Sequence, residues 1–138
     1  MKLILSIITS FTFIITLTGV CFGAPSCTFT SSSSTLPFGA LNPASTANAT
    51  ATMTLTVTCT GNPTWTLTSN NGLYYNGTTK RMRNQNVVTQ FLPYSVTFSP
   101  TSGKKNAVIT GSGTILNSDY INAYIGPYTD QVTLTITP

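Results

Sequence analysis

The chain of 138 residues has six Lys and Arg against two Asp and Glu, no His, and a formal net charge of +4. General acid–base catalysis most often uses His or paired carboxylates, and the two acidic residues, Asp119 and Asp130, are single and separated. This composition predicts no enzyme activity, no cofactor and no metal site, since it lacks clustered ligands and a base for a nucleophile.

A secretory signal peptide is predicted at residues 1–23. Lys2 precedes an uncharged apolar run, Leu3 to Phe22, which small residues follow. We place cleavage after Gly23. A membrane anchor is the alternative interpretation, because the run approaches the length of a spanning helix. Export leaves residues 24–138 as a single domain and argues against nucleic acid as a partner.

Two cysteines remain after cleavage, Cys27 and Cys59. In an exported domain two cysteines usually pair, and closing a loop of about 30 residues stabilises the fold by roughly 3–4 kcal/mol. Two free buried thiols are the alternative.

Residues 51–59 alternate strictly between apolar side chains and threonine. In a strand this period of two places Met53, Leu55, Val57 and Cys59 on one face and the threonines on the other. Threonine is β-branched, which suits a half-exposed strand and suits a helix poorly. The end of the chain repeats the pattern, so both segments predict antiparallel β-structure.

Short strands separated by turn signals are predicted along the whole domain, and no segment has a helical period of useful length. The expected strands, in chain order, are 27–29, 51–59, 65–67, 91–98, 107–109, 114–115, 120–125 and 131–137. This succession predicts an all-β antiparallel sandwich, with Trp65 in its core.

Several loops and irregularities are also predicted. Ser31–Ser34 is expected to be a loop, and Asn76-Gly77 a tight turn between residues 73–75 and 81–83. Pro93 indicates an edge or an irregular start of its strand. Gly111 and Gly113 suggest a β-bulge.

The charged and aromatic residues give two weaker signals. The basic clusters at 80–83 and 104–105 are interpreted as solvated turns without an aromatic ladder, and contact with an acidic cell surface or polysaccharide is the alternative. Leu73, Tyr74 and Tyr75 lie beside turn signals and are candidates for surface contact. Packing into the core is the competing interpretation.

The sequence resembles the spore coat protein U domain family, which includes subunits of archaic chaperone–usher pili, over residues 27–137. The resemblance rests on a cysteine after the signal peptide, Phe38-Gly39, Cys59-Thr60, Arg81-x-Arg83, Leu92-Pro93-Tyr94-Ser95-Val96 and the closing block from Gly126 to Ile136. The sequence departs from the family pattern between residues 98 and 113, where Ser102-Gly103-Lys104-Lys105 replaces the Trp-Gly-x-Gly of many relatives.

The resemblance implies an immunoglobulin-like sandwich that is incomplete and is completed by a donated strand. It implies a disulfide between Cys27 and Cys59, and a periplasmic chaperone, an usher and neighbouring pilus subunits as partners. Only Ala24, Pro25 and Ser26 precede the first cysteine, about 10 Å of extended chain, so we expect a subunit that accepts a strand without donating one, as at a pilus tip.

The resulting prediction is an exported structural or adhesive subunit of a pilus or surface layer that serves attachment to cells or abiotic surfaces, or biofilm formation. It would pass through the periplasm to the cell surface. The alternatives are a self-contained secreted coat protein and a carbohydrate-binding module.

Overall fold

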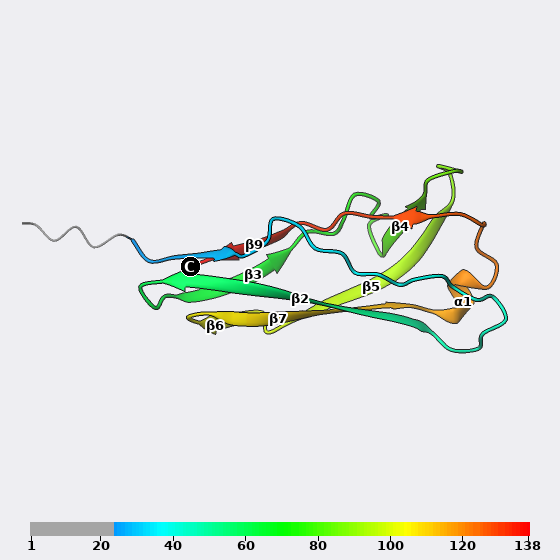
Figure 1. The fold of residues 1–138 in the computed structure, drawn as a ribbon. Coiled ribbons are helices and arrows are strands. Elements are labelled where there is room, and N and C mark those ends of the chain that lie inside the picture. The colour runs from blue at the N-terminus through cyan, green and yellow to red at the C-terminus, as the bar shows by residue number, and fades with distance from the viewer. Residues whose placement is uncertain (1–23) are drawn as a thin grey trace, which may run out of the picture.

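The computed structural model describes residues 24–138, and the predicted signal peptide lies outside the described residues. Nine strands and one helical turn succeed one another in this part of the chain (Figure 1). They are β1 (Ser26–Phe29), β2 (Ala49–Thr60), β3 (Thr64–Ser69), β4 (Lys80–Asn84), β5 (Phe91–Ser99), β6 (Ser102–Lys104), β7 (Ala107–Ile115), α1 (Asn117–Tyr120), β8 (Tyr128–Thr129) and β9 (Leu134–Thr137).

The strands form two antiparallel sheets. The larger sheet has six strands in the order β1-β2-β7-β5-β4-β8, and the smaller has three in the order β6-β3-β9. Figure 1 shows β3 and β9 lying above β2 and β7. Side chains of both sheets meet in one cluster, in which Leu67 of β3 packs with Val57 of β2 and Ile109 of β7. The predicted all-β, immunoglobulin-like antiparallel sandwich is confirmed.

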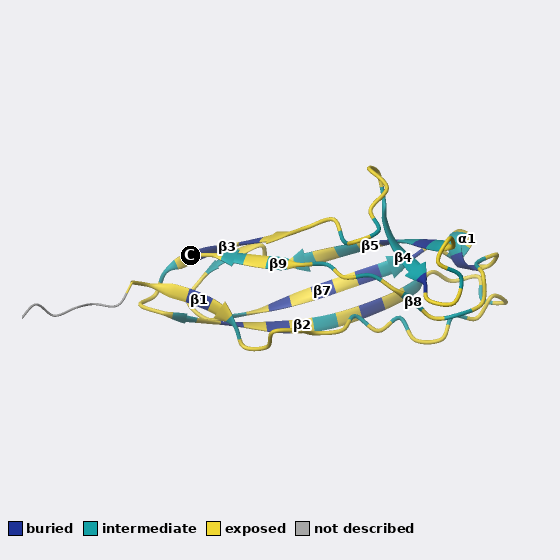
Figure 2. Ribbon diagram, turned by 90° about the horizontal axis from the view of Figure 1, so that it is seen from above, coloured by how far each residue is buried: buried dark blue, intermediate teal, exposed yellow. Residues whose placement is uncertain are grey.

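The threonine-rich strand is the central element of the larger sheet. β2 pairs with β7 from Ala49↔Ile115 to Val57↔Ala107. Leu55 and Val57 are buried, while the threonines from Thr50 to Thr60 are all exposed. Figure 2 shows the same alternation of buried and exposed residues along β2 and β7. The predicted division of this strand into an apolar and a hydroxyl face is therefore confirmed.

β5 changes partners along its length. Its first half pairs with β4, ending at Lys80↔Tyr94, and its second half pairs with β7, starting at Ser95↔Thr114. Pro93 lies in the first half, where β5 pairs with β4 only. Proline has no N–H to donate, and here no strand on the other side of β5 needs that hydrogen bond. The edge that the proline indicates is therefore present in the first half of β5, while the ladder to β4 is regular.

Four local predictions are wrong. Residues 120–125 form no strand: Tyr120 ends α1, and the hydroxyl of this tyrosine donates to Ala47 O at 2.6 Å. Residues 73–75 form no hairpin strand with 81–83. Gly111 and Gly113 lie in an unbroken register with β2 and mark no bulge.

The fourth wrong prediction is that the basic residues of 80–83 and 104–105 lie in turns. Arg81 and Arg83 lie on β4, and Lys104 ends β6. Lys105 alone has a turn conformation, with φ of 64°.

The disulfide joins Cys27 of β1 to Cys59 of β2, which are directly opposite each other in the strand register. The pairing is confirmed, and it fastens the first strand of the domain to its neighbour.

Trp65 lies in the core, as predicted, with 1% of its surface exposed. Its Nε1 donates to Lys105 O at 2.9 Å, and its ring covers Gly103 on the paired strand β6. A Cβ at Gly103 would lie 2.5 Å from Trp65 Cζ2. The glycine is required here because the ring is held in place and has no room to move.

We expect Gly103→Ala to destabilise the domain by about 1–3 kcal/mol through this overpacking. Urea unfolding followed by the fluorescence of the single tryptophan measures the effect. Ser102→Ala, on the exposed neighbour, is the control and should change stability by less than about 0.5 kcal/mol. Equal stability of the two variants would contradict the proposed contact.

Candidate functional site

The two sheets leave two open edges beside each other. Among the described residues β1 pairs only with β2, and β9 pairs only with β3. Just before β9, Thr133 accepts a hydrogen bond from Asn70 N through its carbonyl oxygen and donates its N–H to Asn70 Oδ1, both at 2.9 Å. Because the peptide groups of successive residues point to opposite edges, those of Val132 and Leu134 face the open side. A further strand would find hydrogen-bonding partners there.

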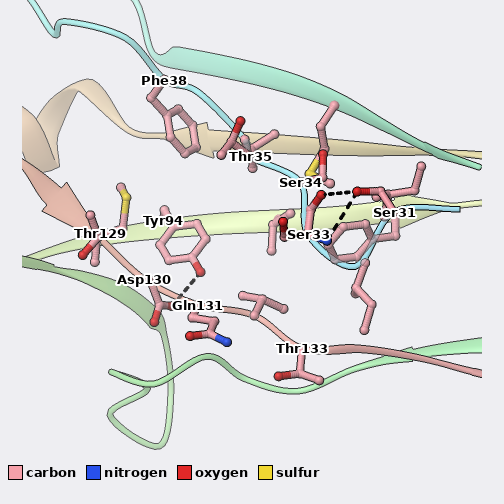
Figure 3. A pocket seen from close by; sticks show the side chains of 18 of the residues that line it. Ser31, Ser33, Ser34, Thr35, Phe38, Tyr94, Thr129, Asp130, Gln131 and Thr133 are labelled. Atoms are coloured by element: carbon pink, nitrogen blue, oxygen red, sulfur yellow. Dashed lines mark hydrogen bonds between the residues drawn. The ribbon is translucent and has the colours of Figure 1, made fainter. Parts of the chain in front are cut away.

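An open groove of about 690 Å³ lies between these edges (Figure 3). Residues 29–38 form one wall, residues 128–134 form the other, and β2, β4 and β5 supply the floor. Serine hydroxyls of Ser31–Ser34 lie at its rim. The interior is lined by the apolar side chains of Phe29, Leu36, Phe38, Met53, Leu55, Met82, Val96, Phe98, Val132 and Leu134, together with Tyr94.

The hydrophobic core is divided into two clusters, and the groove lies between them. One cluster surrounds Trp65 and the other contains Leu92, Tyr94, Ile115 and Tyr120. Partly buried residues of both clusters line the groove: Met53, Phe98 and Leu134 belong to the first, and Met82, Val96 and Val132 to the second. A domain of this size usually has one contiguous core. One more strand with alternate apolar side chains would join the two clusters.

A hydrogen-bonded carboxylate lies at one side of the groove. Tyr94 Oη donates to Asp130 Oδ2 at 2.7 Å, as the dashed line in Figure 3 shows, and Leu73 N donates to Asp130 Oδ1 at 2.9 Å. Burial, and then the hydrogen bond to Asp130 and its negative charge, raise the pKa of Tyr94 well above its usual value. The phenol therefore stays protonated and acts as a fixed donor that ties the 128–134 wall to the floor.

The residues predicted for surface contact lie outside the groove, in the loop between β3 and β4. Leu73 is 63% exposed and Tyr75 is 38% exposed, so packing into the core is the wrong interpretation for these two. Tyr74 is half-buried and packs against Phe91, with 6.0 Å between ring centroids. The structure does not bring the three side chains into one site, and their role in contact stays a prediction.

Sequence reasoning found part of the groove floor but not its walls. The apolar alternation of 91–98 places Tyr94, Val96 and Phe98 on one face, and all three line the groove. For the wall at residues 29–38 the sequence predicts only a loop at Ser31–Ser34. Its signal was the apolar residues on each side of the serines, Phe29 before them and Leu36 and Phe38 after them.

Within residues 24–138 no group of three or more His, Cys, Asp or Glu side chains is placed to hold a metal ion. In the same residues, no helix has both the length and the apolar character needed to cross a membrane.

Comparison with known proteins finds a family model that matches the sequence and solved structures with a similar fold. The sequence model described as Spore Coat Protein U domain matches residues 11–135. A search of curated proteins finds no match.

Solved structures with a similar fold include two chaperone complexes. One is the CsuC–CsuE chaperone–tip adhesion subunit pre-assembly complex from archaic chaperone–usher Csu pili of Acinetobacter baumannii, with 17% identity and a TM-score of 0.54, covering 81% of this chain and 39% of the matched one. The other is a chaperone–tip adhesin complex of CFA/I fimbriae, with 10% identity and a TM-score of 0.49, covering 83% of this chain and 41% of the matched one. The chain thus spans about two fifths of the length of each matched chain.

Proposed function

The chain belongs to the Spore Coat Protein U domain family, and we propose that it is an exported pilus-type subunit whose groove accepts a β-strand from another chain. The division of the hydrophobic core by an apolar groove, next to the open edge of β9, is the observation that carries this proposal. The proposed role is structural and not enzymatic.

Strand addition suits the groove in length and in chemistry. Residues 128–134 span about 20 Å when extended, so about six or seven residues of a donor would follow this wall. Alternate side chains of the donor would point down between the two core clusters, and its main chain would bond to the free peptide groups of Val132 and Leu134. Each fully buried Val, Leu or Ile side chain contributes about 1.5–3 kcal/mol.

The identity of the first donor is part of the proposal. A solved structure of similar fold is named as a complex of a chaperone with a tip adhesion subunit, which supports a periplasmic chaperone as the partner that fills the groove before assembly. An usher and neighbouring subunits would follow, and attachment or biofilm formation is the proposed purpose of the fibre. Removal of residues 1–23 as a signal peptide is proposed as the route of export.

Periplasmic co-expression of the full-length chain with an archaic-type pilus chaperone tests strand acceptance. We expect a 1:1 complex by size exclusion and native mass, and aggregation of the chain without the chaperone. Val96→Glu should prevent the complex, because it places a charge on the apolar floor.

Thr97→Glu is the matched control for this experiment. Thr97 is the next residue of β5 and is exposed, so its charge should leave the complex intact. A soluble, stable monomer that ignores the chaperone would instead indicate a self-contained coat protein. Equal loss of the complex in both variants would remove the groove as the binding site.

A further inference from the structure

The positive charge of the domain is concentrated on one strand. Residues 70–94 contain Lys80, Arg81 and Arg83 and no Asp or Glu. Arg81 and Arg83 are two positions apart on β4, so both point to the face opposite Met82, which lines the groove. The outer face of β4 therefore presents two guanidinium groups side by side.

Both guanidinium groups are stacked on aromatic rings. Arg81 Cζ lies 4.4 Å from the centroid of the Phe91 ring, and Arg83 Cζ lies 4.6 Å from that of Tyr74. The two rings are themselves in contact, with centroids 6.0 Å apart. These four side chains form an arginine–aromatic patch, which corrects the interpretation of residues 80–83 as a solvated turn without an aromatic ladder.

The stacking holds the two guanidinium planes in place. Arg81 Nε also donates to Tyr74 O at 3.0 Å, which fixes this side chain to the β3–β4 loop. A guanidinium held by a ring and a carbonyl loses less conformational entropy when it binds a ligand than a free lysine does. The patch is thus organised before any ligand arrives.

The guanidinium groups of the patch remain available to bind an anion. Arg83 Nε is enclosed by the protein and has no hydrogen-bond partner within the described part of the chain, so a ligand would be held by the outer guanidinium nitrogens of Arg81 and Arg83. The carboxylate of Asp130 already accepts hydrogen bonds from Leu73 N and Tyr94 Oη. A planar guanidinium is suited to bidentate contact with a carboxylate or sulfate group.

We propose that the arginine–aromatic patch binds an acidic polysaccharide through its carboxylate or sulfate groups. This interaction is separate from strand acceptance and uses the opposite face of β4. Proteins that bind single-stranded nucleic acid present open aromatic faces for bases, whereas here each ring is covered by a guanidinium on one face. Charge complementarity therefore favours an anionic polymer, and the covered rings favour an acidic glycan over nucleic acid.

The test measures binding of the protein, exported from the full-length chain, to immobilised heparin and polygalacturonate, with dextran as the neutral control. Where the chaperone is needed for solubility, the complex is used and the chaperone alone is the blank. We expect binding to both acidic polymers, none to dextran, and a loss of about tenfold or more in affinity when salt rises from 50 to 500 mM.

Three variants locate the binding site. Arg81→Gln with Arg83→Gln should weaken binding by about tenfold or more. Lys104→Gln with Lys105→Gln removes the same charge elsewhere and should weaken it by less than about threefold. Arg81→Lys with Arg83→Lys keeps the charge but loses the planar, stacked groups, and should weaken binding by about threefold or more.

Several results would overturn the proposal. Equal losses in the glutamine pairs would mean diffuse charge attraction, and unchanged affinity in the lysine pair would mean that the stacked geometry is irrelevant. Tighter binding of single-stranded DNA than of heparin would assign the patch to nucleic acid. A melting curve for each variant shows whether it is folded. If the glutamine pair at positions 81 and 83 does not fold, the affinity of the lysine pair for heparin tests the proposal.

Discussion

A strand fused after Pro138 should stabilise the domain by about 2–4 kcal/mol. The insert begins with Asn-Gly, which favours a tight hairpin turn, and continues as Val-Thr-Val-Thr-Val-Thr-Val, so that its valines share the inward face of Ile136, Leu134 and Val132. It would run back along the open edge of β9 and place its valines between the two core clusters. The three valines opposite Ile136, Leu134 and Val132 contribute about 1.5–3 kcal/mol each, and the ordering of the insert offsets about half of this.

Urea unfolding of the fusion and of the unmodified protein measures the gain. An insert of the same length with asparagine in place of each valine is the control, because it keeps the turn and the backbone donors but has no apolar side chains. If both inserts stabilise equally, or neither does, the groove does not select apolar side chains. The proposed strand acceptance would then lose its energetic basis.

Loss of the disulfide is expected to have a comparable effect in the opposite direction. Cys27 and Cys59 are 32 residues apart in sequence, and releasing a loop of this length lowers stability by about 3–4 kcal/mol through the entropy of the unfolded chain. The double variant Cys27→Ser with Cys59→Ser tests this without leaving a free thiol.

Formation of the chaperone complex is a second measurement for this variant. β1 continues directly into residues 29–38, which form one wall of the groove, and the disulfide fastens β1 to β2. We expect the double variant to unfold at lower urea and to form less chaperone complex than the original protein. An unchanged unfolding midpoint would show that the β1–β2 pairing and the packing of Phe29 hold this segment without the cross-link.

The sheet architecture could be predicted from the sequence because its signals are local. In β2 the alternation of threonine with Leu55 and Val57 follows from the pleat, and the buried face is the one that the pattern indicates. The same holds for Tyr94, Val96 and Phe98, which form the floor of the groove. A period of two is enough to determine which side chains share a face.

The predicted strand at 120–125 fails because tertiary hydrogen bonds override β-propensity. Asn117 N donates to Asn48 Oδ1 at 2.9 Å, and Asn117 Nδ2 donates to Ser45 O at 2.6 Å. These bonds hold α1 against residues 45–48, about 70 positions earlier in the chain. No local pattern near Tyr120 and Ile121 contains that information.

The walls of the groove and the arginine–aromatic patch could not be predicted from the sequence for a related reason. Residues 30–38 have no ladder after Thr30, so no alternation marks them as a wall. Phe91 lies beside Arg81 only because β5 pairs with β4 before it changes to β7. Contacts of this kind depend on which strands are neighbours in the sheet. The order of the strands cannot be predicted from the sequence of one segment.

The hydroxyl face of β2 has a consequence for how copies of this protein meet each other and their surroundings. This face consists of threonine hydroxyls, which are hydrated and uncharged. Two copies that approach each other by this face therefore experience little electrostatic repulsion, and added salt changes their interaction little. With so few titratable groups in the chain, mild acid also changes little on this face. The domain therefore combines a broad surface that is indifferent to salt and acidity with one strand, β4, where its electrostatic interactions are concentrated.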